Sequence, residues 1–224
     1  MPLKLFLMLD TVIFDMDGVL IDSEPLWAEA ADEVLKEFNV RLSKEQYATT
    51  VGMRTKEFIQ SWFSHYKIGE EHCSLAEKKI VEIILKKVKT NGAVMPGVDY
   101  IFNFFKQRDF KIGLASSSPM ELIDLVIELT GIKPFLNGVA SAEDLPYGKP
   151  HPQVYLNCAE SLGSAPVNCV CFEDSFNGMI AAKAAKMKCV IVPAHNQLKD
   201  ERWGAADLKL SSLQNFGELH LNSL

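Results

Sequence analysis

Residues 11–19 read TVIFDMDGV, and this stretch decides the fold of the chain. The apolar and β-branched run at 11–14 predicts a short buried strand. Asp15 and Asp17 follow it directly, two residues apart. Two carboxylates at the carboxyl end of a buried strand can hold a divalent cation and present an attacking oxygen to a substrate. A simple Asx turn after the strand is the alternative interpretation, and residues farther along the chain decide between the two.

The rest of the chain alternates strand and helix patterns around that first strand. Short apolar runs bounded by turn residues predict strands at 11–14, 111–115, 138–140, 169–172, 189–192 and 207–210. Helical patterns lie at 98–108, 119–129, 152–162 and 177–185. Alternating elements with fully apolar strands predict an α/β fold, a Rossmann-like parallel sheet covered on both faces. In such a sheet, ligands bind beyond the carboxyl ends of the strands.

One long stretch, residues 24–91, interrupts this alternation with helical patterns alone. We expect helices at 25–38, 43–50, 55–66 and 70–89, the second opened by a capping box in SKEQ at 43–46. We therefore predict an all-helical cap domain at 23–91, inserted into a catalytic core domain formed by 1–22 and 92–224. Because both connections land beside Asp15, the cap can open and close over that residue. A fixed helical appendage is the alternative.

Composition limits the kinds of partner that we expect. The net charge of −6, with no long basic run, argues against a nucleic-acid surface. No stretch approaches the ~20 apolar residues of a membrane span, and the apolar N-terminus MPLKLFLML reads as a lead-in to the first strand rather than a signal peptide. Five cysteines without a C-x-x-C pair fit buried thiols in a reducing cytoplasm. The absence of a long exposed apolar stripe favours a monomer.

Three further predicted strand ends carry polar residues. Ser116 and Ser117 follow the strand at 111–115, where a hydroxyl group and backbone N–H groups suit a phosphate. Helix capping by Ser118 is the simpler interpretation of the same segment, and both can hold. Lys149 stands between Gly148 and a proline in a stiff loop, where a cation can neutralise a transferring phosphoryl group. A solvated surface lysine is the alternative there.

An acidic pair, Glu173 and Asp174, ends the strand at 169–172. Buried acids at a strand end are costly unless they meet cations. Beside Asp15 and Asp17 they would complete an all-oxygen site of the kind that Mg²⁺ prefers. Four strand ends thus supply an acid pair, a hydroxyl group, a lysine and a second acid pair.

In this order of motifs the chain resembles the haloacid dehalogenase superfamily, in its phosphatase branch with a helical cap after the first motif. The resemblance covers essentially the whole chain. Four further segments resemble, more specifically, the bacterial hexitol and 2-deoxyglucose-6-phosphate phosphatases, which belong to the β-phosphoglucomutase-like subgroup. Those segments are IDSEPLW at 21–27, ASAEDLPY at 140–147, KPHPQVYL at 149–156 and EDS at 173–175.

The resemblance implies a function and a mechanism. The chain is expected to hydrolyse small phosphorylated sugars or sugar alcohols with Mg²⁺, through an aspartyl-phosphate on Asp15. Asp17 would act as general acid and then as general base. The ion would be held by Asp15, the Asp17 carbonyl group and Asp174, with Glu173 as a ligand or as an anchor behind the ligands. The phosphoryl oxygens would be held by Ser116, the Ser117 N–H group and Lys149.

The cap is expected to supply selectivity, with Glu24, Trp27, Met53 and Arg54 as candidates for sugar contact. Residues 51–54, VGMR, resemble a cap loop whose arginine points into the site. Helix packing is the alternative for Trp27. The nearest rival function is that of a β-phosphoglucomutase-like sugar phosphomutase, in which a cap histidine stands where this chain has Trp27. A non-catalytic phosphosugar-binding protein is a further alternative.

Overall fold

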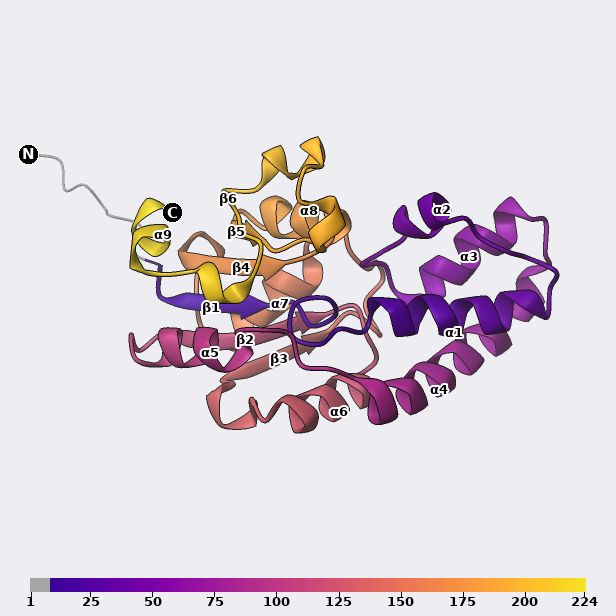
Figure 1. Ribbon diagram of the computed structural model, residues 1–224, viewed down its shortest axis with the longest axis horizontal. Coiled ribbons are helices and arrows are strands. Elements are labelled where there is room, and N and C mark those ends of the chain that lie inside the picture. The colour runs from indigo at the N-terminus through magenta and orange to yellow at the C-terminus, as the bar shows by residue number, and fades with distance from the viewer. Residues whose placement is uncertain (1–8) are drawn as a thin grey trace, which may run out of the picture.

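The computed structural model describes residues 9–224, and a parallel sheet forms its centre (Figure 1). Across the sheet the strand order is β3-β2-β1-β4-β5-β6, and all neighbouring strands run parallel. The strands are β1 (Thr11–Phe14), β2 (Lys111–Ser116), β3 (Gly138–Ser141), β4 (Cys169–Glu173), β5 (Lys188–Ile191) and β6 (Leu208–Lys209). The predicted α/β core is confirmed, with β1 at the point where the strand order reverses and ligands bind in such sheets.

Each end of an observed strand lies within one residue of the predicted end. β1 has the predicted bounds, whereas β2, β3 and β4 each run one residue further, to Ser116, Ser141 and Glu173. The ladder pairs Ser116 with Ser141 although both side chains are polar, because pairing uses backbone groups. These site residues are therefore held by the sheet itself, at the end of its apolar part.

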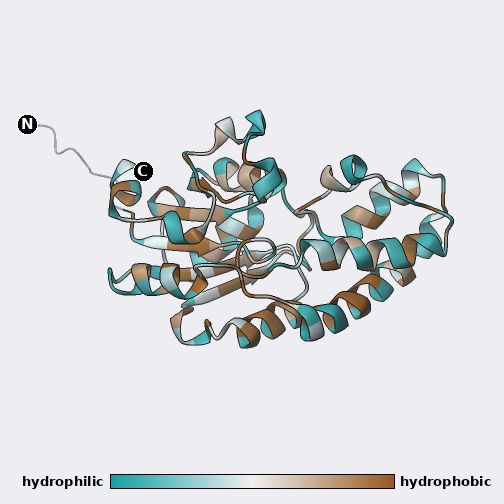
Figure 2. Ribbon diagram, viewed as in Figure 1, coloured by the Kyte–Doolittle hydropathy of each residue, from teal (hydrophilic) through white to brown (hydrophobic). Residues whose placement is uncertain are grey.

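Helices cover both faces of the sheet, and the side chains of β1 alternate between the two faces. Val12 and Phe14 point into the cluster under α5 and α6, whereas Ile13 points into the cluster under α7 and α8. Phe14 stacks on Phe102 and Phe172, with ring centroids 4.7 and 5.1 Å apart. Figure 2 shows the resulting hydrophobic interior.

The helices of the core follow the predicted positions within a few residues, and a short C-terminal helix was not predicted. They are α5 (Val98–Lys106), α6 (Met120–Thr130), α7 (Gln153–Ser161), α8 (Phe176–Ala184) and α9 (Glu218–Ser223). Short 3₁₀ helices lie at η1 (Glu70–His72), η2 (Lys133–Phe135), η3 (Pro166–Asn168), η4 (His195–Gln197), η5 (Glu201–Ala205) and η6 (Leu213–Asn215). Cys169, Cys171 and Cys189 are buried free thiols, as predicted.

Four helices gather beyond the carboxyl ends of the strands, at one end of the molecule (Figure 1). These cap helices are α1 (Glu24–Lys36), α2 (Lys44–Ala48), α3 (Thr55–His65) and α4 (Cys73–Asn91). The predicted capping box is present: Ser43 Oγ accepts from the Gln46 N–H group at 3.2 Å, and Gln46 Oε1 accepts from the Ser43 N–H group at 2.9 Å. The domain boundaries at 22/23 and 91/92 stay a prediction.

The two chain segments that connect the cap helices to the sheet are hydrogen-bonded to each other. The Asp22 N–H group donates to the Ala93 carbonyl at 2.8 Å, and the Met95 N–H group donates to the Leu20 carbonyl at 3.0 Å. The outgoing and returning segments thus form one narrow ribbon beside Asp15. A pair of short segments of this kind can act as a hinge.

Within residues 9–224, none of the helices has the length and apolar character needed to cross a lipid bilayer. The N-terminal lead-in expected from the sequence lies outside the described residues, except for its last residue.

Candidate active site

The site is built where β1, β2 and β4 end and the loop after β3 returns. Asp15 follows β1 directly, and its N–H group donates to the Phe172 carbonyl of β4 at 2.9 Å. The residue is 4% exposed. The sheet therefore fixes the backbone of Asp15 and buries its side chain, so that this residue has little freedom to move.

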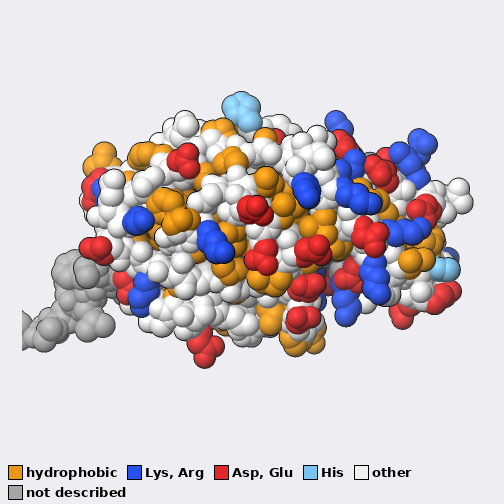
Figure 3. Space-filling view, turned by 90° about the horizontal axis from the view of Figure 1, so that it is seen from below, with side chains coloured by type: hydrophobic (Ala, Val, Ile, Leu, Met, Phe, Trp, Pro, Cys, Tyr) orange, Lys and Arg blue, Asp and Glu red, His pale blue; other side chains and the backbone are white. Residues whose placement is uncertain are grey.

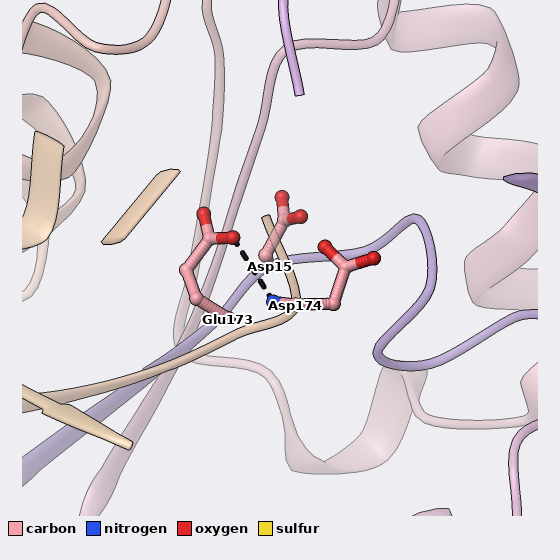
Figure 4. A group of neighbouring side chains, drawn as sticks. All are labelled: Asp15, Glu173 and Asp174. Atoms are coloured by element: carbon pink, nitrogen blue, oxygen red, sulfur yellow. Dashed lines mark hydrogen bonds between the residues drawn. The ribbon is translucent and has the colours of Figure 1, made fainter. Parts of the chain in front are cut away.

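Three acids meet at this point. One carboxylate oxygen from each of Asp15, Glu173 and Asp174 lies within 4.8 Å of the others. Figure 4 shows these three neighbouring side chains. Burial, and then the charge of Glu173, raise the pKa of Asp15 to about 8. Burial and the charge of Glu24 raise the pKa of Asp174 well above its usual range. A divalent cation among these oxygens would stabilise their ionised forms, and hard oxygen donors are those that Mg²⁺ takes.

The three acids differ in how many hydrogen bonds their carboxylate oxygens already accept. Glu173 is fully buried, and its Oε1 accepts from Lys149 at 2.7 Å and from the Tyr155 hydroxyl group. Its Oε2 accepts from the Asp174 N–H group at 3.1 Å and from Ser175. Glu173 thus anchors its neighbours, which leaves Asp15 and Asp174 as the carboxylates suited to an ion.

Lys149 is buried and lies against the carboxylate of Asp15. Its ammonium group donates to Asp15 Oδ1 at 2.6 Å, to Glu173 Oε1 at 2.7 Å and to the Ala115 carbonyl at 3.3 Å. Burial lowers the pKa of Lys149, but the charges of the two carboxylates outweigh it and raise that pKa above its usual value. The interpretation of Lys149 as a solvated surface lysine is wrong: the side chain is 1% exposed.

Asp17 accepts three hydrogen bonds from side chains. Its Oδ1 accepts from Ser23 Oγ at 2.5 Å and from Trp27 Nε1 at 2.9 Å, and its Oδ2 accepts from Ser118 Oγ at 2.7 Å. Ser118 comes from the core, whereas Trp27 comes from α1. The carboxylate of Asp17 is therefore oriented from both sides of the site.

The serines at the end of β2 differ in where their side chains lie, and the phosphate contacts of Ser116 and Ser117 stay a prediction. Ser116 is 1% exposed, and its Oγ accepts from the Ser118 N–H group at 3.0 Å. It does not line the cavity, whereas Ser117 and Ser118 do. Pro119 takes the N-cap position of α6, so the capping role considered for Ser118 is wrong and its hydroxyl group serves Asp17 instead.

A cavity lies between the acids and the cap helices. Glu24, Trp27 and Met53, three of the four predicted cap residues, line it together with Tyr47, which the sequence did not single out. Burial, and then the charge of Asp17, raise the pKa of Glu24 to about 8. The cavity is lined by Asp15, Asp17, Glu24, Trp27, Ala31, Tyr47, Thr50, Val51, Gly52, Met53, Thr55, Phe58, Ile80, Ser117, Ser118, Lys149 and Asp174.

Arg54 departs from the expected arrangement. The sequence predicted a sugar contact for its guanidinium group, but in this structure the side chain does not line the cavity and donates to backbone carbonyls of the loop at 142–146. The reason is geometric, because α3 begins after Arg54 and the residue faces the core loop at the point where cap and core meet.

Comparison with known proteins gives a consistent picture. Residues 12–192 match the family described as haloacid dehalogenase-like hydrolase. The chain is 40% identical over 202 residues to hexitol phosphatase B of Escherichia coli K12, covering 90% of this chain and 91% of that protein. It is 28% identical over 181 residues to the fructose-1-phosphate phosphatase of the same organism, covering 81% and 95%. A solved β-phosphoglucomutase from Clostridium difficile shares the fold, with a TM-score of 0.84, 22% identity and 96% coverage of both chains.

Proposed function

The chain belongs to the haloacid dehalogenase-like hydrolases, and we propose that it is a Mg²⁺-dependent phosphatase acting on small sugar or sugar-alcohol phosphates. The observation that carries this proposal is the buried Lys149 ammonium group, 2.6 Å from the Asp15 carboxylate at the floor of a cavity. A cation beside a carboxylate fits transfer of an anionic phosphoryl group onto that carboxylate. The similarity to hexitol and fructose-1-phosphate phosphatases supports the substrate class.

The proposed reaction has two steps. A carboxylate oxygen of Asp15 forms a bond to phosphorus while the bond from phosphorus to the sugar oxygen breaks, and Asp17 gives that oxygen a proton. Asp17 then takes a proton from water, whose oxygen bonds to phosphorus as the bond to Asp15 breaks. Inorganic phosphate leaves, and both carboxyl groups return to their starting states. Covalent catalysis splits one difficult displacement into two easier ones.

The chain's residues divide the remaining tasks. Lys149 and the N–H groups after β2 would hold the phosphoryl oxygens, and Ser118 orients Asp17 toward the leaving group. Asp15, Asp174 and the Asp17 carbonyl group would hold Mg²⁺, which when bound neutralises charge on the phosphoryl oxygens. We expect chelation to abolish phosphate release and added MgCl₂ to restore it, whereas a metal-independent rate would contradict the assignment.

The scarcity of positive charge in the cavity favours substrates that carry a single phosphate group. Among the described residues that line it, Lys149 is the one lysine or arginine, and it serves the nucleophile end. A phosphomutase that works through an enzyme-bound phosphoryl group must hold a sugar carrying two phosphates between its half-reactions. The cap end offers Glu24 in place of a second cation, and Trp27 is a donor that cannot accept a proton. Hydrolysis is therefore favoured over the mutase alternative.

Incubation of the purified protein with Mg²⁺ and a panel of hexose, hexitol and pentose phosphates tests the proposal. Free phosphate and sugar-phosphate isomers are measured in parallel, and one sugar bisphosphate is included. We expect phosphate release with a preference for six-carbon monophosphates and little activity on the bisphosphate. Isomer formation without free phosphate would make the protein a mutase. Tight binding without turnover of any compound would make it a phosphosugar-binding protein.

A further inference from the structure

The Arg54 side chain is nearly enclosed, although it belongs to the cap and carries a charge. It is 6% exposed. Its partners lie almost entirely in one irregular loop of the core, between β3 and α7. Nη1 donates to the carbonyls of Ala142 at 3.1 Å, Glu143 at 3.4 Å and Leu145 at 2.5 Å, and Nη2 donates to the carbonyl of Pro146 at 3.3 Å and to Glu57 Oε1 at 2.7 Å.

Glu57 contacts the same core loop farther along the chain, at Gly148. Its Oε1 also accepts from the Gly148 N–H group at 2.9 Å. Burial raises the pKa of Glu57, but the hydrogen bonds from Arg54 and Gly148 outweigh it, so that the pKa lies below its usual value. The contacts of Arg54 and Glu57 with the core loop therefore extend to Gly148, the residue directly before Lys149.

Gly148 fits against the pair with no space to spare. A Cβ atom at this position would lie 2.5 Å from Glu57 Oε2, 2.8 Å from Arg54 Nε and 2.9 Å from Arg54 Cγ. These contacts are closer than real Cβ atoms make. The cap pair and the core loop are therefore complementary in shape, although Arg54 Nε and Glu57 Oε2 are buried there without a hydrogen-bond partner.

The loop at 142–148 lies outside the sheet and the helices, and within the core its hydrogen bonds lie mainly near its start, such as that from the Ala142 N–H group to the Ser116 carbonyl at 2.9 Å. A planar guanidinium group with five donors suits several carbonyls at once, which a lysine ammonium group on a flexible stem does not. When the cap is closed, a cap residue thus fixes the loop that ends at Lys149. When the cap opens, the same carbonyls and the Gly148 N–H group lose these partners.

We propose that Arg54 and Glu57 are positioning residues that couple closure of the cap to the placement of Lys149. The inference rests on the proposed function, since Lys149 acts there on the phosphoryl group. Two other cap–core hydrogen bonds, from Ser117 Oγ to the Gly52 carbonyl and from Asn177 Nδ2 to the Val51 carbonyl, are each 2.8 Å long. They join the cap to other loops, so the effect on Lys149 belongs to Arg54 and Glu57.

The first experiment compares Arg54→Ala and Glu57→Ala with the wild type on the best sugar phosphate and on 4-nitrophenyl phosphate. Because misplacement of a catalytic group by about 1 Å can cost 100-fold, we expect kcat to fall by about 10- to 100-fold on both substrates with KM little changed. Lys56→Ala, an exposed position on the same helix, is the matched control and should match the wild type. A rise in KM for the sugar phosphate alone would make Arg54 a sugar ligand and overturn the proposal.

The second experiment reads the loop directly by hydrogen–deuterium exchange. We expect faster exchange in the peptide covering 142–149 for Arg54→Ala and Glu57→Ala, and wild-type exchange for Lys56→Ala. Unchanged exchange in both variants would overturn the coupling. Because this measurement needs no substrate, it tests the coupling even if the wild-type protein releases no phosphate from any compound, a result that would count against the proposed function alone.

A double-mutant cycle sharpens the test. Gly148→Ala should lower kcat in the wild-type background, where the added methyl group meets Arg54 and Glu57. In the Arg54→Ala background, two of its three closest contacts are removed, so the same change should cost much less. Such non-additivity is expected of residues in direct contact. Equal losses in both backgrounds would show that Gly148 acts on Lys149 without Arg54 and would contradict the proposal.

Discussion

At the scale of single residues, the hydrogen bonds to the Asp17 carboxylate explain its proposed role better than the position of Asp17 in the sequence does. Ser23, Trp27 and Ser118 all donate to its carboxylate. A donor-only indole on α1 means that the cap orients the carboxylate to which we assign the proton transfers. The interpretation of Trp27 as a packing residue is therefore incomplete, because the ring also carries a polar contact into the site.

This contact leads to a prediction for Trp27→Phe. The change keeps an aromatic ring and removes one hydrogen bond to a carboxylate, a contact of about 1.5–3 kcal/mol. We expect kcat to fall by about 10-fold, with the fold intact by circular dichroism. Trp62→Phe is the control, because Trp62 is a second cap tryptophan, it is buried, and its Nε1 has no hydrogen-bond partner. Equal effects of the two changes would remove the role assigned to Trp27.

At the scale of elements, the turn from β4 into α8 brings the acids together in a small space. Ser175 caps α8 by accepting from the Gly178 N–H group at 3.0 Å, and its own hydroxyl group donates to Glu173. A Cβ atom at Gly178 would lie 1.8 Å from Glu173 Oε1. The helix start therefore approaches the anchor carboxylate so closely that only glycine fits.

We predict that Gly178→Ala lowers kcat by about 100-fold, since it displaces Glu173 and with it Lys149. Its helical position tolerates alanine, so the loss should come from the site rather than from the helix. Gly204→Ala is the matched control, because a Cβ there meets no atom within 4 Å. Steady-state kinetics and thermal unfolding of both variants check this. Wild-type kcat in Gly178→Ala would contradict the anchoring role of Glu173.

The sequence predicted the elements better than it predicted side-chain directions. The strand ends that carry Asp15 and the acid pair follow from apolar periodicity and the parallel-sheet rule, since these fix the backbone, whereas Lys149 lies in the loop between β3 and α7. The contact of Ser118 with Asp17, and the turn of Arg54 toward the core loop, depend on which tertiary partner each side chain meets. Tyr47, on the five-residue helix α2, gave no periodic signal at all.

At the scale of the whole molecule, the surface carries charges of both signs. Figure 3 shows acidic and basic side chains intermingled over the cap end of the face in view. Ion pairs join α1 to α4, such as those of Lys87 with Glu29 at 2.8 Å and with Glu33 at 2.9 Å. Exposed pairs of this kind contribute little to stability, so the cap is held mainly by the apolar faces of α1, α3 and α4.

The carboxylate of Asp207 has a shifted pKa, and it therefore makes the free energy of unfolding depend on pH. Burial raises its pKa, but hydrogen bonds from Lys183 and from the Cys189 N–H group outweigh burial and hold the pKa below its usual value. A lowered pKa means that the unfolded chain binds the proton more tightly, so this stabilisation is complete above about pH 4 and is lost as the pH falls through the folded-state pKa.

We therefore predict that Asp207→Asn lowers the free energy of unfolding by about 1–2 kcal/mol at neutral pH. The difference from the wild type should shrink as the pH falls below about 4. Urea unfolding across this range measures it, and Asp200→Asn, which removes an exposed partner of Arg202, is the control with a smaller effect. A difference that grows toward acid would reverse the sign assigned to Asp207.

The central claim is that Asp15 carries the phosphoryl group, and intact-protein mass spectrometry tests it most directly. Asp17→Asn is mixed with Mg²⁺ and 4-nitrophenyl phosphate, whose leaving group needs no proton donor, and is quenched in acid within one turnover. The account predicts a protein heavier by one phosphoryl group, with the label on the peptide containing residue 15 and none in the Asp15→Asn, Asp17→Asn double variant. Release of 4-nitrophenol without any labelled protein, or a label that persists after Asp15→Asn, would contradict it.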